Sequence, residues 1–77
     1  MAQQTSAPHA YAASQRDIAR LIEILQAELE RHAEGHRDSP RDWGRVGDLR
    51  KVRSDLKQAV GFISRFEPED VERAISA

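Results

Sequence analysis

The 77-residue chain contains no cysteine, so neither disulfides nor thiolate metal sites can stabilise it. No apolar run approaches the ~20 residues that a bilayer-spanning helix needs, and the N-terminal residues lack the basic and apolar regions of a signal peptide. No stretch alternates as a strand does, and no glycine-rich phosphate loop is present. These absences predict an all-α, soluble, cytoplasmic protein that is not an enzyme and uses no cofactor.

The overall charge is nearly balanced. The chain has twelve Lys and Arg residues and thirteen Asp and Glu residues, which gives a net charge of -1. This balance argues against a dedicated nucleic-acid binder. A chain of this length forms one small domain at most and buries a limited share of its surface, so self-association is expected to supply part of its stability.

The first expected helix covers residues 14–34. Residues 1–13 show no apolar periodicity, and we expect them to be a disordered tail. Ser14 can cap the helix and Gly35 can end it. Apolar residues then recur at spacings of three and four and form one stripe, with two further residues widening it. The stripe consists of Ile18, Ile22, Leu25 and Leu29, widened by Leu21 and Ile24.

The second expected helix covers residues 48–66. Its apolar stripe consists of Leu49, Val52, Leu56, Ala59, Val60, Ile63 and Phe66. Extended backwards to Pro40, the same helix would place Trp43 about 160° from the stripe and both Arg41 and Arg45 within it. We therefore expect the helix to begin at Asp48, after a turn at Gly47. Trp43 and Val46 would then form an apolar plug in a connection over residues 35–47.

A short third helix is expected over residues 68–76, led by Pro68 and acidic residues. Two longer helices joined by a short connection favour an antiparallel hairpin. Ile24 and Phe62 lie off the centres of their stripes and offer a second apolar surface. We expect a second copy to cover it, giving a homodimeric four-helix bundle with the hairpin seam at Leu25, Leu29, Val52, Leu56 and Ile63.

Two clusters could carry chemistry. His32 and His36 have the spacing of metal ligands on one helix face. However, Gly35 is expected to end the helix between them and no third ligand is evident, so we assign no metal site. In the second helix Arg50, Lys51, Arg53 and Lys57 form a basic face that could contact phosphates. Acidic segments of the same chain could neutralise this face.

The run Trp43-Gly44-x-Val46-Gly47-Asp48-Leu49 resembles a W-G-x-V-G-[DS]-L pattern in short bacterial proteins to which no activity is attached. It is also similar to the Trp-x-Gly turn of secreted WXG-type helical hairpins, which dimerise into four-helix bundles. Here glycine follows tryptophan directly and the expected helices are shorter, so that family's role in secretion is not carried over.

The function that these patterns favour is a small non-catalytic interaction or regulatory module that associates with itself or with another protein. The alternative is a nucleic-acid-binding regulator that uses the basic face of the second helix. Association with a membrane surface through Phe62 and Phe66 is disfavoured, because a helix pair would use those side chains in its core.

Overall fold

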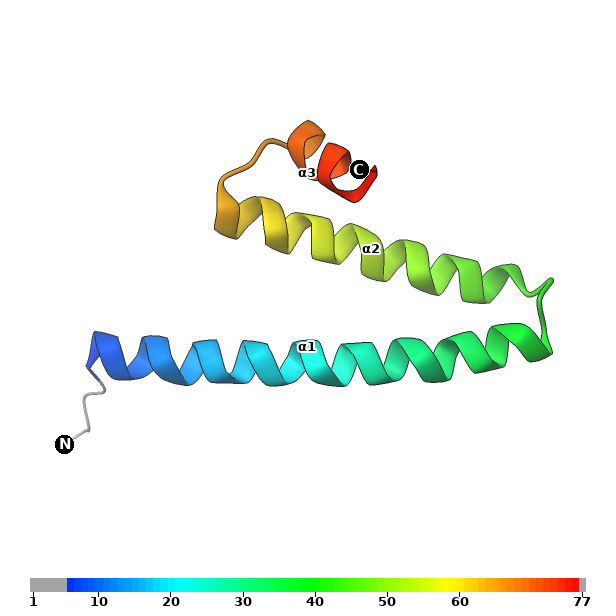
Figure 1. Cartoon of the computed structure of the whole chain (residues 1–77), viewed down its shortest axis with the longest axis horizontal. Helices are drawn as coiled ribbons and strands as arrows, with labels where there is room; N and C mark the ends of the chain where they lie inside the picture. The colour runs from blue at the N-terminus through cyan, green and yellow to red at the C-terminus, as the bar shows by residue number, and fades with distance from the viewer. Residues whose placement is uncertain (1–5, 77) are drawn as a thin grey trace. The chain divides into compact units, whose positions relative to one another are not determined.

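The computed structural model describes residues 6–76 and forms three α-helices, which are α1 (Ala7–Asp38), α2 (Trp43–Ser64) and α3 (Pro68–Ser76) (Figure 1). No strand occurs within this range, and the predicted all-α class is confirmed. The chain divides into two compact units, one up to Ser39 that contains α1 and one from Pro40 that contains α2 and α3. The hairpin and the dimeric bundle stay predictions.

Helix α1 begins at Ala7, so the predicted disordered tail is wrong for residues 7–13, while residues 1–5 lie outside the described range. Ser6 is the N-cap, and its hydroxyl accepts a hydrogen bond from the His9 N–H at 3.3 Å. Pro8 lies in the first turn, where its missing N–H costs no helical hydrogen bond. These residues lack apolar periodicity but are rich in alanine, the strongest helix former, so local propensity extends the helix.

The end of α1 also differs from the prediction. The helix passes through Gly35 and ends at Asp38. The Ser39 N–H donates to the carbonyls of Gly35 and His36 at 3.1 Å each. Pro40 stops the helix here, because its ring disfavours helical backbone in the residue before it. Proline is therefore the terminator in this segment, and Gly35 is an interior helical residue.

Helix α2 begins at Trp43, so the predicted start at Asp48 is wrong. Asp42 is the N-cap, and its carboxylate accepts a hydrogen bond from the Gly44 N–H at 2.9 Å. No described glycine has a positive φ, and Gly47 lies inside the helix rather than in a turn. The connection therefore spans residues 39–42 instead of 35–47.

The predicted plug at Trp43 is also wrong, because this side chain is 72% exposed in the first turn of α2. Val46 is half-buried. Arg45 is half-buried too, with its Nε 3.8 Å from Asp42 Oδ2. For Trp43 and Arg45 this is the outcome that the helical wheel gave for an extended helix, whereas Arg41 lies before the helix and is exposed. The cap at Asp42 favours the early start, and the long stem of arginine can lie along apolar surface while its charge stays near a carboxylate.

Helix α2 ends at Ser64 rather than at Phe66, and Arg65 adopts the left-handed conformation with φ 64° and ψ 20°. The Ser64 hydroxyl donates to the Val60 carbonyl at 2.6 Å and accepts from the Phe66 N–H at 3.1 Å. The chain thus leaves the helix through a left-handed residue, a position that usually holds glycine.

The third helix has the bounds that the sequence predicted, Pro68–Ser76. Pro68 occupies its first position, and the Asp70 carboxylate accepts a hydrogen bond from the Glu67 N–H at 3.2 Å. This is one half of a capping box. The proline and the acidic residues that follow it therefore mark the start of α3, as the sequence predicted.

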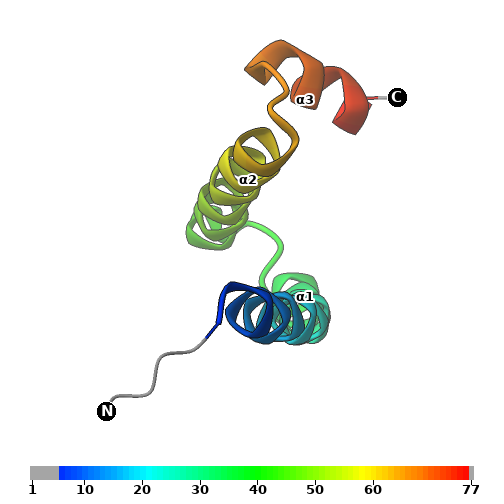
Figure 2. The ribbon, with the colours of Figure 1, turned by 90° about the vertical axis from the view of Figure 1, so that its left-hand side faces the viewer.

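Helix α3 turns back and lies alongside α2, as both ribbon views show (Figures 1 and 2). Val71, which is 4% exposed, is the one buried hydrophobic residue of the described chain. The stripes of α1 and α2 stay largely exposed. Their exposed members include Ile18, Leu21, Ile22, Ile24, Leu29, Leu49, Leu56, Val60 and Ile63.

Candidate interaction surfaces

The contact between α2 and α3 is built around Val71 and Gly61. A Cβ placed on Gly61 would lie 3.9 Å from Val71 Cγ2 and 3.7 Å from the Phe66 carbonyl oxygen. Both are ordinary van der Waals distances. An alanine at position 61 would therefore fit without moving the two helices apart. The contact is small, and α3 needs a second attachment to stay in place.

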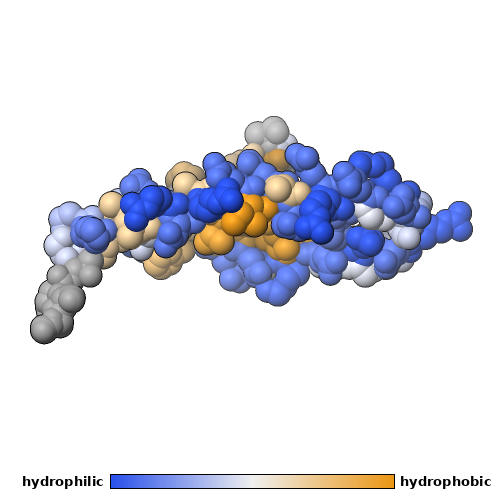
Figure 3. Space-filling model, turned by 90° about the horizontal axis from the view of Figure 1, so that it is seen from below, coloured by the Kyte–Doolittle hydropathy of each residue, from blue (hydrophilic) through white to orange (hydrophobic). Residues whose placement is uncertain are grey.

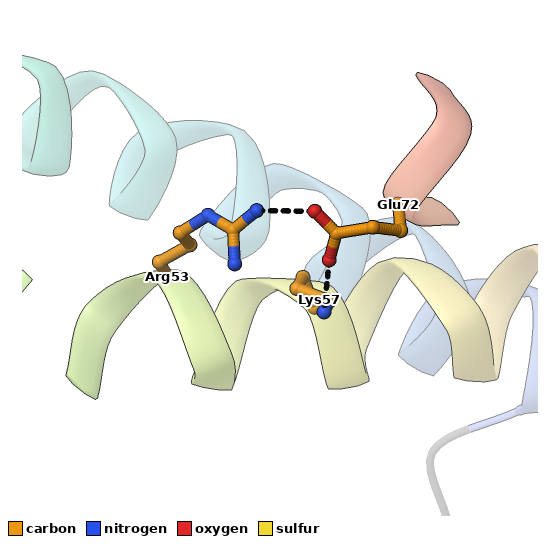
Figure 4. A network of polar contacts seen from close by, with 3 residues as sticks. All are labelled: Arg53, Lys57 and Glu72. Atoms are coloured by element: carbon orange, nitrogen blue, oxygen red, sulfur yellow. Dashed lines mark hydrogen bonds and ion pairs between the residues drawn. The ribbon is translucent and has the colours of Figure 1, made fainter. Parts of the chain in front are cut away.

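Glu72 provides that attachment (Figure 4). Its Oε2 lies 2.6 Å from Arg53 Nη2 and its Oε1 lies 2.5 Å from Lys57 Nζ, so one carboxylate on α3 bridges two cations on α2. These two hydrogen bonds lower the pKa of Glu72 below its ordinary value, and the bond from Lys57 has the larger effect. The carboxylate is thus held in the charged form that its partners require.

Helix α3 covers the face of α2 that carries Arg53, Lys57 and Gly61. This is the basic face, not the apolar stripe. Leu49, Leu56 and Val60 remain exposed, at 43%, 43% and 46%. The last helix therefore docks, but it leaves the apolar surface of its neighbour open.

The four predicted nucleic-acid residues each have an intramolecular contact. The Arg50 guanidinium lies 6.0 Å from the centroid of the Trp43 ring, at the limit of a cation–π contact. Lys51 Nζ lies 2.7 Å from Asp55 Oδ2. Arg53 and Lys57 share Glu72, as described above. Much of the positive charge predicted for this face is therefore compensated by carboxylates of the same chain.

Phe62 is 73% exposed and lies with Phe66 and Pro68 along an open groove at the junction of α2 and α3. The Arg65 guanidinium lies 5.3 Å from the Phe62 ring centroid, within cation–π range. The other lining residues are Ser54, Lys57, Gln58, Gly61 and Val71. Of the residues predicted for interaction, Phe62 and Trp43 are thus the most accessible, and they lie near opposite ends of α2.

Helix α1 carries one of the two apolar stripes, and no other helix belongs to its unit. Ile24 is exposed on it and Leu25 is half-buried. Figure 3 shows exposed apolar surface, drawn in orange, with hydrophilic surface on either side. Ion pairs within the helix engage its charged residues, with Arg20 3.0 Å from Glu23 and Arg31 3.1 Å from Glu28. Local ion pairs thus engage four of the charged side chains of α1, whereas most of its large apolar side chains remain exposed.

His32 and His36 both lie inside α1, four residues apart, because the helix does not end at Gly35. Among residues 6–76 no group of three or more His, Asp or Glu side chains is arranged to hold a metal ion. The two imidazoles occupy the last two turns of the helix, where its dipole favours positive side chains.

Comparison with known proteins gives no match to a protein-family model, to a curated protein or to a solved structure. The resemblance carried by the Trp43–Leu49 run therefore stays a prediction. Of the three described helices, none is both long enough and apolar enough to cross a membrane.

Sequence reasoning named Val71 only as an apolar residue of the last helix and did not single out Glu72 or Gly61, which with Val71 join α3 to α2. A signal for Glu72 was present, because the chain has acidic segments that could neutralise the basic face. No signal indicated which carboxylate would do so, since Glu72 lies 19 residues from Arg53 along the chain. Gly61 is one of three glycines within α2, and its spacing alone does not distinguish it.

Proposed function

We propose that this protein is a small, non-catalytic helical interaction module that associates with itself through the apolar stripes of α1 and α2. The observation that carries the proposal is the exposure of nearly every large apolar side chain in the described chain, with Val71 alone buried. Exposed apolar surface arranged in continuous stripes is typical of interaction sites, whereas scattered single residues are not.

The position of α3 supports this proposal over nucleic-acid binding. Glu72 compensates Arg53 and Lys57, and Asp55 compensates Lys51, so a phosphate backbone would have to compete with carboxylates already in place. At the same time α3 leaves the apolar stripe of α2 open. The arrangement thus favours a surface that removes apolar area from water, which is the main driving force of protein association.

The test is the solution mass, measured by sedimentation or light scattering over a series of concentrations. We expect a dimer that dissociates on dilution. Ile22→Asp, which places a charge in the α1 stripe, should shift the dissociation constant upwards by two orders of magnitude or more, because an uncompensated carboxylate would be buried in the contact.

Ala27→Asp is the matched control. It adds the same charge to the same helix on the opposite face, so it should leave the mass unchanged. A wild-type chain that is monomeric at every concentration would refute the proposal, and retention on heparin at low salt that weakens as salt rises would favour the nucleic-acid alternative.

A further inference from the structure

The full length of α1 creates a seam that the shorter predicted helix did not have. Because the helix runs from Ala7 to Asp38, it includes two positions before Ile18 and two positions after Leu29 that continue the same spacing of four and three. The seam consists of Tyr11, Gln15, Ile18, Ile22, Leu25, Leu29, His32 and His36. Alternating spacings of three and four residues are the pattern of a two-helix coiled coil.

This seam reads the same in both directions. Its four central residues are aliphatic, the next residue on each side is polar (Gln15 and His32), and the outermost are ring side chains (Tyr11 and His36). If two copies of α1 lie antiparallel about a point between residues 23 and 24, aliphatic positions meet aliphatic ones and polar positions meet polar ones. A surface that is complementary to itself in this way is what a twofold-symmetric contact requires.

The charges of α1 select the antiparallel orientation. Residues 7–22 hold two arginines and one aspartate, a net charge of +1, whereas residues 23–38 hold two arginines and five carboxylates, a net charge of -3. An antiparallel pair places the positive half of each helix beside the negative half of the other. A parallel pair would place the two acidic halves together, and like charges at an interface oppose association. The helix dipoles also favour opposite directions.

Small side chains flank the seam. Ala12, Ala19 and Ala33 occur at a spacing of seven or a multiple of seven, each one residue after a seam position. The distance between two packed helix axes depends on the side chains at the contact, and alanine allows a short one. On the opposite flank Leu21 adds apolar area, and its side chain is exposed in the single copy.

We propose that α1 is the self-association element of this protein and that it pairs antiparallel with α1 of a second copy. In this register Ile22 faces Leu25 of the other copy and Ile18 faces its Leu29. Gln15 faces His32 and Tyr11 faces His36, so each polar seam residue has a hydrogen-bonding partner. The inference rests on the proposed function, to which it adds the interface, the orientation and the register.

The experiment uses single-cysteine variants of the full chain, which has no cysteine of its own. Gln15→Cys and His32→Cys are prepared separately, mixed to allow exchange of subunits, and treated with a short bis-maleimide. In the proposed register residue 15 of one copy faces residue 32 of the other, while the two copies of residue 15 are about 25 Å apart at 1.5 Å per residue. We expect covalent dimer in the mixture and only background in each variant alone.

Ala27→Cys sets the background, because it lies on the opposite face of the same helix. Cross-linking of Gln15→Cys with itself would show a parallel pair and overturn the inference. A dimer by mass without cross-linking above background would place the interface elsewhere, which overturns the inference but leaves the proposed function standing. A monomer by mass at every concentration would refute both.

Discussion

Replacing Gly47 with alanine should stabilise the protein. Gly47 lies inside α2, and a Cβ built on it has no atom within 4 Å. The change therefore adds no contact, and the expected gain is the difference in helix propensity between the two residues, about 1 kcal/mol. For a chain of this size that gain corresponds to a rise in melting temperature of about 4–8 °C, which thermal unfolding followed by far-UV circular dichroism would detect.

Two other glycines of α2 serve as controls. Gly61→Ala should also stabilise, since its Cβ meets its neighbours at ordinary distances of 3.7 and 3.9 Å. Gly44→Ala should bring no gain, because its Cβ would lie 3.0 Å from Asp42 Oδ1 and disturb the N-cap. A lower melting temperature for Gly47→Ala would refute the reasoning, since alanine destabilises where the backbone needs a positive φ, as in a turn that ends before Asp48.

Further predictions concern four side chains, one in α2, one directly after it and two in α3. Val71→Ala should destabilise the docked α3 by about 2 kcal/mol, measured by hydrogen exchange of its amides. Trp43→Ala should change the free energy of unfolding by no more than about 1 kcal/mol, because only an exposed ring and its contact with Arg50 are lost. If chemical denaturation showed a loss of several kcal/mol, Trp43 would have to be buried, as the plug interpretation requires. Arg65→Gly should be more stable than Arg65→Ala by about 1 kcal/mol in the same assay, since both lose the guanidinium and only glycine relieves the left-handed backbone. The pKa of Glu72 in the folded protein is lowered from 4.5, so the stability that its carboxylate adds to the docked α3 is present above pH 4.5 and is lost as the pH falls through the lower folded value. The NMR chemical shifts of α3 should change over the pH range of this loss. In Glu72→Gln, which cannot titrate at this position, they should not change there.

Local patterns account for what the sequence predicted correctly. The apolar spacing of three and four, and the absence of alternation, indicated helices throughout. Pro68 and the acidic residues after it gave the bounds of α3, because a proline at the first helical position and carboxylates in the first turn act within a few residues.

The errors at the other helix ends have local causes as well. Ser6, Asp42 and Pro40 are the signals that bound α1 and α2, but they compete with Ser14, Asp48 and Gly35, which are equally good signals when read alone. The prediction of a plug at Trp43 assumed that a large aromatic must be buried. In a chain with so small a core, the cap at Asp42 outweighs the exposure of one ring.

The sequence by itself determined the all-α class, the number of helices and the existence of two apolar stripes, because helical propensity and periodicity are properties of neighbouring residues. Only the tertiary structure decided that α3 docks on the basic face of α2 and leaves the stripe open. That choice depends on Val71 meeting Gly61 and on Glu72 reaching Arg53 and Lys57. Such contacts join residues that are distant along the chain, and their geometry exists only once both helices have formed.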